Sequence, residues 1–144
     1  MMRMEIALIL VLVFVAFIYF SAGRRNTPLH KTFSVLLAIT PLHLAFDAAT
    51  VYTVNHLETV PPVLNEILHR LFIGTMVLVV YLFYRYISIL VEEETKKPVR
   101  FHLVAKIYLI LAELGAMLLP VHYAVTAKGN YSDGIHVSVC YIST

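Results

Sequence analysis

Two polar residues inside an apolar stretch are the strongest candidates for chemistry in this sequence. His43 and Asp47 are four residues apart within residues 32–55, so a helix would place them on one face. A charge inside an apolar span is costly and usually faces other helices or a wet cavity. The pair could bind a ligand or respond to protons, with Asp47 holding the imidazole. The alternative is a polar pair that only fixes helix packing through hydrogen bonds.

Glu113 is a third candidate, because it is the only charged residue in the apolar run 107–125. A carboxyl group in such a place can be a proton or cation site, as in small multidrug exporters. It can also be a structural group that desolvation keeps protonated. If His43, Asp47 and Glu113 meet, they form a polar centre within the apolar region.

His69 and Arg70 lie near the start of the third apolar run, residues 63–91, beside Glu66. Glu66 and Arg70 have the favourable i, i+4 order of a helical ion pair, which contributes only about 0.2–0.5 kcal/mol. These residues form either a solvated helix end or an outward-facing patch that grips an anionic ligand. Arg85, two helical turns before the end of the same run, is expected to extend its guanidinium to the lipid headgroups.

Several kinds of chemistry have no matching pattern. The sequence contains no nucleophile–base arrangement, phosphate-binding glycine loop or histidine cluster with metal-ligand spacing, and its single cysteine, Cys140, forms no intrachain pair. We therefore expect no catalytic residue, no metal site and no cofactor. The net charge of +2 comes from short basic clusters between apolar runs, so a nucleic-acid partner is not expected.

The elements that hold these residues are expected to be membrane helices. Of the 144 residues, 60% are hydrophobic and only 14% are charged, against about 25% charged in ordinary globular domains. Each long run approaches the length of roughly 20 residues that crosses a bilayer as a helix. The sequence thus predicts an all-α polytopic bundle in one membrane domain, with the lipid bilayer as its first partner. The expected helices are residues 4–23, 32–55, 63–91 and 103–125.

The two ends of the chain leave further points open. A cleaved signal peptide is the alternative for the first run, but Arg24 and Arg25 directly after it favour a membrane anchor. Residues 126–144 are expected to form an outer loop and the start of a fifth helix, which is too short to cross a bilayer.

Lysines and arginines predict the orientation of these helices in the plasma membrane. They gather in the first loop, at 24–31, and in the third, at 96–106, whereas the second loop has none before Arg70. Cytoplasmic loops carry an excess of Lys and Arg. The first and third loops are therefore expected in the cytoplasm, and the N-terminus outside.

Four segments carry a family resemblance: one follows the first helix, one ends the second, one opens the third and one ends the fourth. They are RRNTPLHK (24–31), FDAATVY (46–52), PPVLNEILHRLF (61–72) and LPVHY (119–123). The pattern resembles the N-terminal membrane sensor region of bacterial diguanylate cyclases (GGDEF proteins) and is similar to the seven-helix N-terminal region of some histidine kinases.

That resemblance implies seven helices, an outer N-terminus and a cytoplasmic output domain. With four helices and the beginning of a fifth, the chain is expected to be a truncated sensory input module, or a stand-alone one acting on a partner signalling protein or as a homodimer. An unknown small ligand would shift its helix packing. The rival interpretations are a small oligomeric proton-coupled transporter, using Glu113 or Asp47, and a membrane assembly subunit without a ligand.

Overall fold

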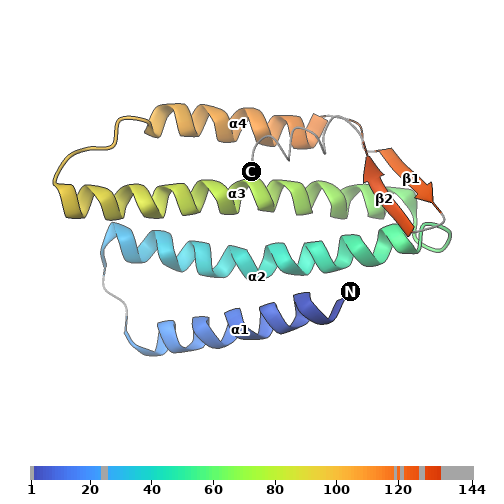
Figure 1. Cartoon of the computed structure of the whole chain (residues 1–144), viewed down its shortest axis with the longest axis horizontal. Coiled ribbons are helices and arrows are strands. Elements are labelled where there is room, and N and C mark those ends of the chain that lie inside the picture. The colour runs from blue at the N-terminus through green and yellow to red at the C-terminus, as the bar shows by residue number, and fades with distance from the viewer. Residues whose placement is uncertain (1, 24–25, 119, 121, 127–128, 134–144) are drawn as a thin grey trace.

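Four helices and a short β-hairpin make up the described part of the chain in a computed structural model (Figure 1). The structure describes residues 2–23, 26–118, 120, 122–126 and 129–133. The predicted number of helices is confirmed. The elements are α1 (Met2–Ser21), α2 (Pro28–Asn55), α3 (Pro62–Thr95), α4 (His102–Leu118), β1 (His122–Thr126) and β2 (Gly129–Asp133).

Local signals explain where the helices begin and end. Thr27 caps α2, because its hydroxyl accepts a hydrogen bond from the backbone N–H of His30 and Pro28 supplies the preset φ of a first helical position. Helix α2 therefore starts four residues before the expected position 32. Lys96 ends α3 in the left-handed conformation, with φ of 55°, a common helix C-terminal device.

The fourth helix is shorter than expected, and the prediction of a helix over 103–125 is wrong at its end. Helix α4 ends at Leu118, and residues 122–126 form a strand that pairs antiparallel with β2. Pro120 cannot donate the next helical hydrogen bond. The residues beyond it include Tyr, Val and Thr, which favour strands. The hairpin replaces the outer loop expected from residue 126, while the expected fifth helix lies outside the described residues.

The helices form a single row, which differs from the expected bundle. Figure 1 shows α1, α2, α3 and α4 side by side in chain order, and each packs mainly on its neighbour in the sequence. The most extensive contact joins α2 and α3. Tyr19 connects α1 to α2, since its ring packs edge-on against Phe33 at 4.8 Å and its hydroxyl lies 3.0 Å from Nδ1 of His30.

Two of the helices, α2 and α3, are long and apolar enough to cross a membrane. Only 11% and 22% of their most apolar windows are buried within the structure, whereas the core helix of a water-soluble domain would be mostly buried. The apolar part of α1, Ile6–Ser21, and the 17 residues of α4 are shorter than a typical span. The structure thus supports membrane-spanning length and composition for two of the four expected spans.

Candidate functional site

His43 of α2 reaches the middle of α3. Its Nδ1 lies 3.1 Å from Oγ1 of Thr75, and its ring stacks on Phe72 with the centroids 5.3 Å apart. The Thr75 hydroxyl also lies within hydrogen-bond distance of the carbonyls of Leu71 and Phe72, at 2.7 and 3.0 Å. The imidazole is therefore held both by a hydrogen bond and by ring stacking.

Asp47 lies one helical turn after His43 and acts on it electrostatically, as the shared helix face predicts. Its side chain is partly buried. Pro41, two residues before His43, interrupts the hydrogen-bond ladder of α2. The polar pair therefore sits next to a weak point of its own helix.

Glu113 reaches α3 from the other side. A Cβ atom placed on Gly74 would lie 3.0 Å from Oε2 of Glu113, so the absence of a side chain at Gly74 makes room for the carboxyl group. Gly74 and Thr75 are consecutive residues. His43 and Glu113 thus arrive at the same level of α3 from two different helices, and α3 stands between them. Of the three predicted residues, His43 and Glu113 share this level and Asp47 lies one helical turn from His43, although no hydrogen bond joins His43 to Glu113 in the described part of the chain.

His69 is buried between the helices, with only 3% of its surface exposed, so the expectation of a solvated helix end or an outward-facing patch is wrong for this residue. It follows Asn65 by one helical turn, and Asn65 is 1% exposed. The hydroxyl of Thr53 on α2 donates to Oδ1 of Asn65 at 2.8 Å. Residues at i, i+4 share a face, and this face of α3 packs on α2 through polar groups. The four-residue spacing of Asn65 and His69 in the sequence is the signal that indicates this shared polar face.

Arg70 holds the end of α4. Its Nη1 donates to the carbonyl of Ala116 at 3.2 Å and to that of Met117, while Nε and Nη2 donate to Glu66 Oε1 at 3.1 and 2.6 Å. A helical N–H at position 120 would normally bond the Ala116 carbonyl, but Pro120 has none. The guanidinium supplies that missing donor and places a positive charge at the negative end of the helix dipole.

A second polar cluster joins α3 to the start of α4, and the sequence did not reveal it. Arg85 Nη1 donates to His102 Nδ1 at 2.9 Å, and His102 Nε2 donates to Glu92 Oε1 at 2.9 Å. Glu92 lies beyond the apolar segment 71–91 and also accepts from the backbone N–H of Val99 at 2.8 Å. That backbone bond, followed by the one from His102, lowers the pKa of Glu92 below its ordinary value of 4.5. The turn between α3 and α4 is therefore held by an ionised carboxylate.

The expectation that Arg85 extends toward the headgroups stays a prediction; in the structure its guanidinium bonds His102 at the start of α4. Across the described residues, no three His, Cys, Asp or Glu side chains come together as metal ligands. The polar interactions between the helices are hydrogen bonds and charge interactions, and α3 takes part in them with both α2 and α4. No protein-family model, characterised protein or solved structure shows significant similarity to this chain.

Proposed function

We propose that this chain is a polytopic plasma-membrane protein in which all four helices cross the bilayer. The support is the surface of the two shorter helices. On α1, Phe14 and Phe17 are 64% and 68% exposed, and on α4 Leu111 and Leu118 are 63% and 76% exposed. Such a continuous apolar surface is unfavourable in water and suits lipid. The open faces of the helix row would be covered by lipid or by a partner, such as a second copy of the chain.

The proposed orientation places the N-terminus outside and the α3–α4 turn in the cytoplasm, because the lysines and arginines concentrate at that turn. In a Cys140→Ser background, Glu58→Cys is expected to react with a membrane-impermeant maleimide in intact cells. Lys97→Cys is expected to react only after the membrane is permeabilised. The reverse labelling pattern would show the opposite orientation, and equal labelling of both positions in intact cells would refute the spanning arrangement.

Within this arrangement the function that we propose is sensory input to a signalling partner, the function that the family resemblance also implies. The observation that carries it is the convergence on α3: His43 bonds Thr75, and Glu113 packs on the adjacent Gly74. A ligand or membrane state that changes either contact would shift the packing of α3 against both neighbours. Such a shift requires different affinities for the two packing states. Helix α3 is 34 residues long, so it would carry a change from mid-membrane to the cytoplasmic turn.

A fusion tests this function. The chain is joined, through one added transmembrane segment, to a cytoplasmic diguanylate cyclase domain, and cyclic di-GMP is measured in cells of different membrane composition. His43→Leu removes a hydrogen bond between helices; such bonds average about 0.6 kcal/mol in membranes, so the output is expected to change about threefold.

The matched control is Thr40→Val. The Thr40 hydroxyl bonds the Leu36 carbonyl within its own helix, so this variant is expected to leave the output unchanged. An output that responds neither to membrane composition nor to His43→Leu would sink the proposal. A change of equal size in both variants would also count against it, since the effect would then not come from the α2–α3 contact.

A proton-coupled transporter is the second candidate, favoured by the carboxyl group of Glu113 within an apolar helix facing Gly74. Uptake driven by a proton gradient in vesicles, lost in Glu113→Gln, would support transport over sensing. Uptake that survives both Glu113→Gln and Asp47→Asn would argue against a coupling site at this level of α3.

A further inference from the structure

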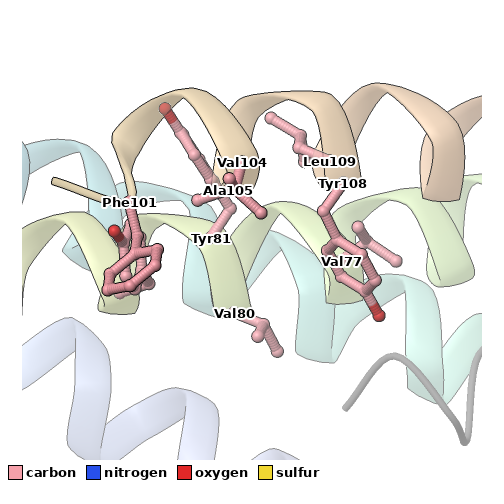
Figure 2. Close-up of a pocket in the computed structure, with 9 residues that line it drawn as sticks. Val77, Val80, Tyr81, Phe101, Val104, Ala105, Tyr108 and Leu109 are labelled. Atoms are coloured by element: carbon pink, nitrogen blue, oxygen red, sulfur yellow. The ribbon is translucent and has the colours of Figure 1, made fainter.

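The contact between α3 and α4 changes character along its length. Beyond Glu113, Ile73 of α3 and Ala116 of α4 form a buried apolar cluster. On the other side the helices leave a groove of about 360 Å³ between them (Figure 2). Small-molecule sites occupy about 300–1,000 Å³, so the groove has room for one slender ligand.

Apolar and aromatic side chains line this groove. In Figure 2, Phe101 lies at one end, Tyr108 and Leu109 lie toward the other, and Tyr81 extends from α3 alongside α4. Tyr84 also contributes to the lining, and its hydroxyl is buried without a hydrogen-bond partner among the described residues. A buried phenol O–H normally has a partner. Because this hydroxyl has no accessible surface, a ligand in the groove would meet an almost wholly apolar lining.

The positive charge of Arg85 lies near the part of the groove that Tyr84 lines. Arg85 follows Tyr84 in the sequence, and its Nη1 donates to Nδ1 of His102, whose ring lies edge-on to Tyr84 at 6.2 Å. Among the described residues Arg85 forms no salt bridge within 4.0 Å, although Glu92 interacts with it electrostatically at longer range. One of the five guanidinium N–H donors is used in this contact. A carboxylate matches the guanidinium fork.

We propose that the groove binds a single-chain amphiphile with a carboxylate head, of the fatty-acid class. The acyl chain lies against Val104, Ala105 and Tyr108, and the carboxylate accepts hydrogen bonds from Arg85. In the orientation proposed above, Arg85 is near the cytoplasmic headgroups, the depth at which the carboxylate of a fatty acid sits in the inner leaflet. This inference uses the membrane placement of the chain and does not depend on signalling.

The test uses the full chain without an output domain, in nanodiscs of zwitterionic phosphatidylcholine. A dodecanoate carrying a diazirine near the end of its chain is photolysed, and the labelled peptides are mapped by mass spectrometry. Label is expected on residues 77–84 and 101–109. Unlabelled dodecanoate is expected to compete at about tenfold lower concentration than dodecanol or dodecylamine, the effect of one charge-assisted hydrogen bond.

Three variants connect the binding to the groove. Ala105→Phe fills the groove and is expected to reduce labelling about tenfold, whereas Ile110→Phe, at a position 58% exposed on the same helix, is the matched control. Arg85→Gln is expected to remove the preference for dodecanoate over dodecanol, while both compounds still bind through their alkyl chains. Arg100→Gln, which removes a nearby exposed cation, is expected to keep that preference.

Two results would overturn the proposal. Equal competition by dodecanoate and dodecanol in the unmodified protein would show that no carboxylate is recognised. Labelling that is unchanged by Ala105→Phe, or spread over all lipid-facing helices, would show ordinary partition into the bilayer. Should Ala105→Phe fail to fold, the loss of preference in Arg85→Gln decides the question alone.

Discussion

Replacing Arg70 with glutamine is expected to lower the free energy of unfolding by about 2 kcal/mol, because hydrogen bonds to a charged group contribute about 1.5–3 kcal/mol and the helix dipole adds up to about 1 kcal/mol. The guanidinium bonds the carbonyls of Ala116 and Met117 at the end of α4. Pro120 removes the backbone donor that would replace it. Unfolding by SDS in mixed micelles, followed by circular dichroism, measures the change.

Glu66→Gln separates this role from that of the ion pair. Glu66 is 47% exposed and bonds Arg70 only within α3, so its loss is expected to cost less than about 1 kcal/mol. Arg70→Lys keeps the charge but offers a single ammonium group in place of the fork, and is expected to be intermediate. A cost in Glu66→Gln equal to that in Arg70→Gln would mean that the ion pair, rather than the cap on α4, provides the stability.

The Arg70 contacts show which parts of a site can be derived from sequence. The Glu66–Arg70 pair is visible there, because spacing along one helix fixes which side chains are neighbours. The bond to α4 joins residues 46 positions apart, so it depends on the register between two helices. The sequence does indicate the acceptor in that contact, though not the donor. Pro120 leaves the Ala116 carbonyl without its helical donor, but nothing in the sequence says which cation supplies the replacement.

The fold shows the same difference between features set by local sequence and features set by how the helices pack together. Apolar length predicted four helices, since each run must satisfy its own backbone hydrogen bonds wherever it packs. Hydropathy alone also extended the last helix through 122–126, where Pro120 and strand-favouring side chains instead begin a hairpin. The single row of helices was not predicted, because runs that are apolar on all sides have no one face that specifies a neighbour.

The sequence singles out the candidate residues of the polar centre but does not give their geometry. His43, Asp47 and Glu113 were recognised because charged and polar groups are rare inside apolar runs. Their partners on α3, Thr75 and Gly74, are an ordinary threonine and glycine with no signal of their own. Only the register of α3 between its two neighbours brings them into contact with His43 and Glu113.

Gly74→Leu is the second substitution expected to have a large effect, a loss of about 2 kcal/mol in the free energy of unfolding, within the range of about 1–3 kcal/mol for overpacking. The new Cβ would lie 3.0 Å from Glu113 Oε2, and the further carbons would enter space that α4 occupies. Gly74→Ala is expected to be close to neutral, because the end of the flexible Glu113 side chain can shift and alanine favours a helix by about 0.8–1.0 kcal/mol over glycine. The same SDS titration measures both variants.

The double variant Gly74→Leu/Glu113→Ala shows whether the carboxyl group is the obstacle. Removing it opens the space that the leucine needs, so at least half of the lost stability should return, and the two substitutions should be strongly non-additive. If the double variant is no more stable than Gly74→Leu, the clash lies with the backbone of α4 rather than with Glu113. If Gly74→Ala already costs as much as Gly74→Leu, the carboxyl group cannot shift. Recovery in the double variant would establish that Gly74 is a glycine because Glu113 lies against it.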